Sequence, residues 1–376
     1  FIFREKFFNS THLIELKRDE EPKLYNFIDE TANEINTNIP NRIFLSPFVE
    51  TYVKFNSTFF SLFFPKRKNL VLGMGLMNSI TLLEFKSIVA HELGHFSQKF
   101  LGVSSYVYYT NKVLYNILYE NDDFFEAVKE SKITLILIRS IQSILKRIYN
   151  LIFSNFSKLS IFWEYQADEI SAKISGSKPN ITSLLRTTLS FSAWDSVLNY
   201  YYNRKNDLIV TDNIFPQHSY VLNYFAEKYN LPIEYNLPLI DLENYNKFNK
   251  SKLVIKDQWA SHPPIEERVL FFQKLNYPSK AESSTKSVEI LKNNELYQQK
   301  LTNIIFQDVE SSKSSLSIKE FIEDFKRIND PLFFDPIFNH YYDIKIPSLF
   351  ILKDIDVRDL DDNLILTSLY CEYNVR

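Results

Sequence analysis

Hydrophobic side chains recur along much of this chain at the three- and four-residue spacing of helices. Near the N-terminus, Leu24, Phe27 and Ile28 share one side of a helix that this spacing predicts over residues 20–36. The same spacing predicts further helices over most of 106–175, with Gly176 at its end, and over 181–202, 217–229, 288–307 and 318–328. The pattern therefore describes a mostly helical protein.

Patterns typical of strands occupy a small part of the sequence. Runs of β-branched and aromatic residues, bounded by Pro and Asn, predict three short strands at 42–45, 51–56 and 69–73. Polar stretches rich in Asn, Lys and Ser predict loops at 241–258 and 278–287. Together these patterns predict an α+β fold that is predominantly helical and contains a small antiparallel sheet.

Composition narrows the class of protein without naming a function. The 376 residues include 45% hydrophobic and 24% charged residues, which is an ordinary globular balance. The net charge of -3 argues against a nucleic-acid partner, because phosphate binding requires a concentrated excess of Lys and Arg. The single cysteine, Cys371, excludes a disulfide framework and a zinc site built on several thiolates. The chain starts at Phe1, and we expect it to be part of a longer protein with an N-terminal membrane anchor.

Two histidines four residues apart, His91 and His95, stand in the sequence HELGH. Thr81 and Glu84 upstream form a capping-box pattern, which predicts that a helix begins directly after them. On a helix, both imidazoles would lie on one face and could bind one Zn²⁺, with Glu92 beside the metal to accept a proton from water. The alternative is an exposed helix with two unrelated histidines.

A catalytic zinc site usually has three protein ligands and one position for water. A metzincin arrangement fails here, because Gln98 and Leu101 stand where Gly and His are needed. The remaining common solution is a carboxylate on a second helix, and the segment FWEYQADEISAKISG offers Glu164 with Asp168 one turn later. Glu164 would then bind the metal, and Asp168 would accept a hydrogen bond from a ligand or an arginine. A solvated acidic helix face is the alternative, although the neighbouring alanines indicate close helix packing.

HELGH followed by EYQAD resembles the zinc metallopeptidases of the HtpX and CAAX prenyl protease type, which are gluzincins. The lead-in NLVLGMGLMNSITLLEFKSIVA and the later segment SHPPIEERV are similar to that family as well. The resemblance implies a zincin-like metallopeptidase domain over 1–277, with core motifs in 42–176 and 259–270 and a helical insertion at about 177–258. It leaves 278–376 as a C-terminal region of unknown role.

Carried over residue by residue, the resemblance implies three ligands for Zn²⁺, namely His91, His95 and Glu164. It implies that Glu92 is the general base and that Asp168 orients a ligand. Arg268 would pair with an acidic partner such as Asp168, and His262 would donate a hydrogen bond to the developing oxyanion. Without the resemblance, His262 is more simply interpreted as an exposed histidine in a His-Pro turn.

This set of residues implies a zinc-dependent metalloendopeptidase in which zinc activates a water and Glu92 takes its proton. In zincins a strand at a sheet edge flanks the active-site helix. We therefore expect an extended peptide or unfolded protein substrate to pair with the strand formed by Asn69, Leu70, Val71, Leu72 and Gly73. A core strand is the alternative for this segment. The alternative function is a catalytically silent, chaperone-like relative that binds peptides in the same cleft.

The segment between the two motifs carries an apolar stripe with basic residues between its positions, at Ile138, Ile141, Leu145, Ile148 and Ile152. Two interpretations remain for the helix 133–158: it rests on a membrane surface, or it packs over the active site. Packing is favoured because buried stripes are common in soluble helices. With the expected anchor, the sequence predicts an enzyme of protein processing or quality control associated with a bacterial cell membrane. A soluble cytoplasmic enzyme is the alternative.

Overall fold

The structure is a computed structural model, and it describes residues 12–55, 68–97, 114, 118, 132–204, 209–248, 263–279, 285–307 and 314–333. The chain forms two compact units, Phe1–Lys326 and Arg327–Arg376. The first unit extends past residue 277, where the sequence placed a domain boundary. The reason is local, because the Ser287 hydroxyl donates to the Met77 carbonyl at 2.8 Å and the Ile214 amide donates to the Thr302 hydroxyl at 3.1 Å.

A four-stranded sheet lies in the first unit, in the order β1-β2-β4-β3. Its strands are β1 (Ile14–Leu16), β2 (Ile43–Ser46), β3 (Tyr52–Phe55) and β4 (Lys68–Gly73). β2 and β4 run parallel, with Ile43 opposite Leu70, while the other two pairs are antiparallel. The sheet is therefore mixed, and the prediction of an antiparallel sheet is wrong. The strand β1 was not predicted, because three residues carry too short a pattern.

The strand β4 is an interior strand, so the prediction that residues 69–73 form a sheet edge is also wrong. It pairs with β2 on one side and with β3 on the other, and on that side β3 is the outer strand among the described residues. The side chains of Leu70, Val71 and Leu72 are fully buried. A continuous apolar run of this kind is typical of a strand that is covered on both faces. Its backbone is already paired and cannot accept an added substrate strand.

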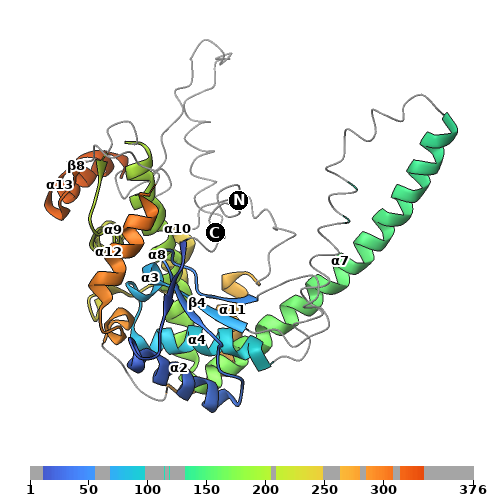
Figure 1. Cartoon of the computed structure of the whole chain (residues 1–376), viewed down its shortest axis with the longest axis horizontal. Helices are drawn as coiled ribbons and strands as arrows, with labels where there is room; N and C mark the ends of the chain where they lie inside the picture. The colour runs from blue at the N-terminus through green and yellow to red at the C-terminus, as the bar shows by residue number, and fades with distance from the viewer. Residues whose placement is uncertain are drawn as a thin grey trace, which may run out of the picture. The chain divides into compact units, whose positions relative to one another are not determined.

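The helix α4 (Leu82–Ser97) occupies the centre of the helical part. The helices α2 (Pro22–Ile35), α7 (Lys132–Ser175) and α8 (Ser177–Tyr202) pack against it, as does the short 3-10 helix η5 (Ser287–Ile290). In Figure 1 the end of α7 that precedes α8 lies beside α4 and α11 (Ile265–Leu275). The described part also contains further helices and two small strand pairs: α3 (Met74–Met77), α9 (Phe215–Lys228), α10 (Leu242–Phe248), α12 (Asn294–Ile305), β5–β8 (Ile209–Val210, Ser314–Ser315) and β6–β7 (Ile233–Glu234, Leu237–Pro238).

Most predicted helices are confirmed, including those that became α2, α4, α8 and α9, and α13 (Ile318–Asn329), which η6 (Asp330–Leu332) follows. Gly176 ends α7 as predicted, and its φ of +94° lets α8 begin at the next residue. Two predictions are wrong in part. The helix expected over 288–307 is divided into η5 and α12, and the loop expected over 241–258 contains α10. Residues 106–131, apart from 114 and 118, lie outside the described part of the chain.

The apolar stripe of α7 is not covered as the sequence favoured. Ile141 is 57% exposed and Ile148 is 43% exposed, whereas Leu145 and Ile152 are half-buried. The burial prediction is wrong for the first two, and the side chain of Ile138 lies outside the described residues. Amphipathic spacing shows that a face is apolar and does not show what covers it. Among the described residues, no helix carries an apolar stretch long enough to cross a membrane.

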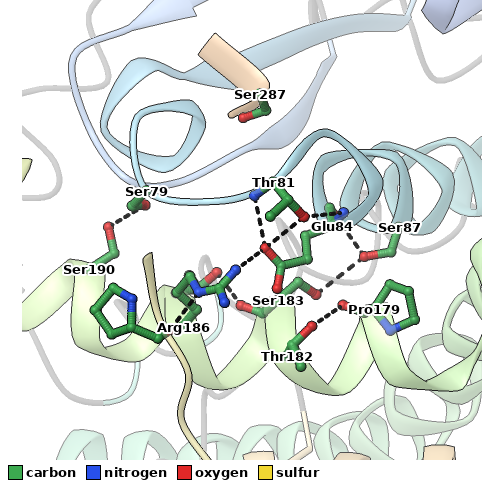
Figure 2. A network of polar contacts seen from close by, with 12 residues as sticks. Ser79, Thr81, Glu84, Ser87, Pro179, Thr182, Ser183, Arg186, Ser190 and Ser287 are labelled. Carbon is green, nitrogen blue, oxygen red and sulfur yellow. Dashed lines mark hydrogen bonds and ion pairs between the residues drawn. The ribbon is translucent and has the colours of Figure 1, made fainter. Parts of the chain in front are cut away.

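A buried polar network fixes the N-terminal end of α4 (Figure 2). The Thr81 amide donates to the Glu84 carboxylate at 2.8 Å, and the Glu84 amide donates to the Thr81 hydroxyl at 3.3 Å, which is the predicted capping box. Arg186 on α8 forms an ion pair with Glu84, and its Nε donates to the Pro238 carbonyl at 2.8 Å. Both charged side chains are almost fully buried. The network therefore ties α4, α8 and β7 together at one point.

His218 on α9 is part of the packed core of the first unit. Its side chain is fully buried, and its Nε2 donates to the Ser190 carbonyl at 3.0 Å. The imidazole meets the Trp194 ring edge-on, with the ring centroids 5.2 Å apart. Burial lowers the pKa of His218 to about 4, so this histidine is neutral in the folded protein near pH 7.

Candidate metal centre

The crossing of α4 and α7 creates the site, and small side chains allow the crossing. A Cβ placed on Gly94 would lie 3.3 Å from the Ala167 Cα, so the two backbones approach closely at this point. Two turns earlier on α4, the carbonyl of Ser87 accepts a hydrogen bond of 2.6 Å from the Ser171 hydroxyl of α7. These contacts set the HELGH face of α4 directly against the EYQAD face of α7.

Three side chains converge at this crossing and present ligand atoms that lie within 4.8 Å of one another: His91, His95 and Glu164. The two histidine Nε2 atoms are 3.3 Å apart. A carboxylate oxygen of Glu164 lies 3.4 Å from the His91 Nε2, and the other lies 3.5 Å from the His95 Nε2. Two donors bound to one tetrahedral Zn²⁺ at about 2.05 Å are about 3.3 Å apart. The spacing of the three side chains therefore fits a single small cation.

A buried ion pair holds the first of these histidines in place. The Asp168 Oδ1 lies 2.9 Å from the Nδ1 of His91. Arg268 on α11 binds both oxygens of Asp168, through its Nε at 2.8 Å and a terminal nitrogen at 2.5 Å. Asp168 is fully buried. With Nδ1 of His91 beside Asp168, Nε2 is the nitrogen that would bind a cation, and orienting a metal-binding histidine in this way is the usual role of such a carboxylate.

The electrostatics of the site favour positive charge. Burial lowers the pKa of His91, but hydrogen bonds to the Asp168 and Glu164 carboxylates outweigh burial and raise the pKa to about 10. Burial would also raise the pKa of Asp168, yet its hydrogen bonds with His91 and Arg268 hold that pKa below the ordinary value. Carboxylates that stabilise a proton between them would also stabilise a divalent cation in the same place.

The structure describes Glu92 and the strand residues 69–73 among the other predicted site residues, but not His262. Glu92 is partly exposed on α4, and its charge helps to raise the pKa of Arg268, so the two groups lie in the same neighbourhood. His262 lies outside the described residues, although the helix α11 that follows it is described. Asn69, Leu70, Val71, Leu72 and Gly73 are buried in β4, away from solvent. A substrate-binding role for that strand is therefore abandoned.

Sequence reasoning missed two residues that support the metal helix. Arg186 pairs with Glu84 at the beginning of α4, as described above. At the other end of α4, the Lys68 ammonium donates to the Phe96 carbonyl at 2.7 Å, and burial lowers the pKa of Lys68 to about 8. A cation near the last carbonyls of a helix is stabilising. Neither residue belongs to a recognisable motif, so the linear sequence offers no signal for these contacts.

A helix carrying His-Glu-x-x-His, completed by a glutamate from a second helix, is the arrangement of a metallopeptidase centre. The profile described as peptidase family M48 matches residues 21–276, which is more than half of the chain and includes every described residue of this centre. The protein belongs to peptidase family M48. Neither the curated proteins nor the solved structures gave a match to this chain.

Proposed function

We propose that this M48 peptidase is a zinc-dependent metalloendopeptidase. The observation that carries the proposal is the set of ligand separations, 3.3, 3.4 and 3.5 Å, between His91, His95 and Glu164. Two imidazoles and one carboxylate are the donor set that Zn²⁺ takes in catalytic sites of this type. When bound, zinc would polarise the scissile carbonyl and lower the pKa of a water toward neutral.

The residues around the ion would each have a defined task. Glu92 would take a proton from the attacking water and pass it to the leaving amine, because it adjoins His91 and is partly open to solvent. Asp168, held by both nitrogens of Arg268, would keep the His91 imidazole in the orientation and tautomer that a metal requires. His262 would donate a hydrogen bond to the developing oxyanion, a role supported by its place in the SHPPIEERV segment.

The finer assignment is also a proposal. The motifs HELGH, EYQAD and SHPPIEERV support an enzyme of the HtpX or CAAX prenyl protease type within family M48. We expect it to cleave peptides or unfolded proteins in protein processing or quality control at a bacterial membrane. Prenylated substrates are not implied by these residues.

The test combines metal analysis with a single-atom change at the proposed base. Purified protein should contain about one zinc per chain, which elemental analysis measures. Glu92→Gln should keep that zinc and lose casein cleavage by several orders of magnitude, because the amide cannot accept the proton. A matched control is Glu169→Gln on α7, where the carboxylate pairs only with the exposed Lys173 among the contacts described, and activity should be unchanged.

Three outcomes would contradict the proposal or redirect it. Full casein cleavage by zinc-loaded Glu92→Gln would remove Glu92 from its role. Purified protein without a transition metal, even after incubation with Zn²⁺, would refute the centre itself. Zinc binding and casein binding without any cleavage product by mass spectrometry would identify a catalytically silent, chaperone-like relative instead.

A further inference from the structure

The outer part of α7 exposes an unusual number of large apolar side chains. Over residues 141–162, seven of them are at least 40% exposed, and Ile161 lies apart from the other six, which are Ile141, Ile144, Ile148, Leu151, Leu159 and Phe162. Their spacing is helical, and at 100° per residue all six fall within a sector of roughly 80°. They form a stripe in two parts, hereafter the α7 stripe, which spans about 30 Å of helix on either side of residues 153–157, whose side chains lie outside the described part of the chain. Exposed apolar stripes of this length in folded proteins mark sites of interaction.

The charged residues in the segment that carries the α7 stripe are all of one sign. The sequence from residue 132 to residue 163 contains five basic residues and no Asp or Glu: Lys132, Arg139, Lys146, Arg147 and Lys158. The rest of the chain carries 38 Lys and Arg against 46 Asp and Glu, so it is acidic as a whole. Lys146, Arg147 and Lys158 are exposed. At 100° per residue, Arg147 and Lys158 lie about 80° and 60° from the centre of the stripe, which places them along one of its margins, whereas Lys146 lies on the opposite side of the helix.

We propose that the α7 stripe is a lipid-binding surface that lies in the headgroup region of a bilayer containing anionic lipids. A helix with one apolar face and basic residues along its margin lies in the plane of such an interface. The long side chains of Arg147 and Lys158 can reach anionic headgroups while the isoleucines enter the acyl boundary. The proposal deepens the membrane setting proposed above by naming the surface and the lipid, and it rests on that part of the proposed function.

Charge argues for lipid over the other occupants of such a surface. A second copy of this chain, bound stripe to stripe, would bring the basic margins formed by Arg147 and Lys158 together, which is unfavourable. A bilayer with anionic headgroups satisfies both the apolar and the basic part of the surface at once. A protein partner with an acidic groove is the remaining occupant, and the experiment below distinguishes it from a bilayer.

The test is flotation of the full chain with vesicles of phosphatidylcholine alone and of phosphatidylcholine with about one third phosphatidylglycerol. Binding should be at least tenfold stronger to the anionic vesicles, because each basic residue near the surface adds about fivefold, and it should weaken with salt. Arg147→Glu/Lys158→Glu should reduce this binding by at least tenfold. The matched control, Lys23→Glu/Lys274→Glu, makes the same change in net charge at exposed lysines of α2 and α11 and should bind like the wild type.

The depth of insertion gives a second readout that does not depend on charge. Ile148→Trp places an indole on the α7 stripe, and Asn150→Trp places one on the opposite side of the helix, where the side chain is also exposed. On anionic vesicles the emission of the Ile148→Trp variant should shift to the blue, relative to the wild type, and that of Asn150→Trp should not. Equal shifts for both variants would overturn the orientation of the helix that we propose.

Three other results would overturn the proposal. These are absence of binding to any vesicle, binding that is equal on neutral and anionic vesicles, and dimerisation in solution that Ile144→Ser/Ile148→Ser abolishes. The casein assay is run on the same variants without vesicles. Lost lipid binding with intact cleavage would refute the surface alone, whereas lost cleavage in Glu92→Gln with intact lipid binding concerns only the catalytic site.

Discussion

The two halves of α7 form one helix and meet opposite surroundings. In the inner half, Ala167, Asp168 and Ser171 are fully buried and contact α4, at Gly94, His91 and Ser87 respectively. In the outer half, branched and aromatic side chains stand in the open along the α7 stripe. The small and polar residues of the inner half let the two helix backbones approach and position the metal ligands. The bulky apolar residues of the outer half present an apolar surface to a bilayer, as we propose. The two halves differ in what covers their side chains, since Ile174 of the inner half is 8% exposed and Ile144 of the outer half is 59% exposed.

The largest effect in this comparison is expected for the charge buried in the inner half. Asp168→Asn should lower the free energy of unfolding by about 3–5 kcal/mol, because it leaves the buried guanidinium of Arg268 without its carboxylate. It should also weaken zinc binding about 10- to 100-fold, since His91 loses the group that orients it. Urea unfolding and a zinc titration measure the two effects.

A double variant shows whether that loss comes from the pair. Asp168→Asn/Arg268→Gln removes both charges, so its loss of stability should be smaller than the sum of the two single losses. Additive losses, or a loss below about 1 kcal/mol for Asp168→Asn, would show that the inner half does not depend on this ion pair.

Acid should destabilise the packed core of the first unit, where His218 is fully buried. His218 has a folded-state pKa of about 4, below its unfolded value of about 6.5. Its contribution to stability is therefore complete above pH 6.5 and is lost as the pH falls toward 4. Between pH 7 and pH 4.5 this should lower the free energy of unfolding by about 2–3 kcal/mol.

The variant His218→Gln separates this histidine from the carboxylates that also titrate in acid. Its amide can donate to the Ser190 carbonyl in place of the imidazole but cannot gain a charge. The difference in stability between pH 7 and pH 4.5 should shrink in this variant by the amount given above. An identical pH dependence in wild type and variant would be evidence against a neutral, buried His218.

A methyl group at the helix crossing should have a smaller effect. Gly94→Ala would place a Cβ 3.3 Å from the backbone of Ala167, so α4 and α7 must separate by a few tenths of an ångström. Overpacking costs about 1–3 kcal/mol, and the better helix propensity of Ala offsets about 1 of this. We expect a net loss of up to about 2 kcal/mol in urea unfolding, together with weaker zinc binding. If close packing is the cause, adding Ala167→Gly should restore zinc affinity in part, because it removes the Ala167 Cβ, 3.5 Å from the new methyl group, and leaves the Cα.

The smallest effect is expected on the α7 stripe. Ile144 is 59% exposed, so Ile144→Ser should change the free energy of unfolding by less than about 0.5 kcal/mol. The matched control is Ile174→Ser on the inner half of the same helix, where the isoleucine is 8% exposed and the loss should exceed about 2 kcal/mol. Similar losses for the two variants would show that the stripe is packed against the protein in solution.

Local patterns in the sequence predicted the elements that depend on local physics. The capping box of Thr81 and Glu84 gave the beginning of α4, and helical spacing gave α2, α8 and α9. Strand order could not be predicted in this way, because it is a matter of pairing partners. The apolar run at 69–73 suits an interior strand, and only the insertion of β4 between β2 and β3 shows that it is one.

The residues of the candidate metal centre also differ in whether a local sequence pattern predicts them. The spacing of His91 and His95 on a helix is local and could be predicted, whereas the choice of Glu164 rested on a second helix whose packing the sequence suggested only through its alanines. The pairing of Asp168 with Arg268 joins residues 100 positions apart and came from the family resemblance. Arg186 had no motif at all, because a lone arginine acquires meaning only from the buried carboxylate it meets.

A single helix, α7, connects the α7 stripe to the metal centre. Glu164 and the isoleucines of the α7 stripe share an uninterrupted rod of hydrogen-bonded turns, and Ile141 stands about 35 Å along the rod from the ligand carboxylate. The point at which α7 packs against α4 would be the pivot of any tilt of this helix. A tilt of the outer half of α7 by a few degrees about this crossing would therefore displace the Glu164 carboxylate by less than one ångström. Ligand spacing around a cation is set on that scale.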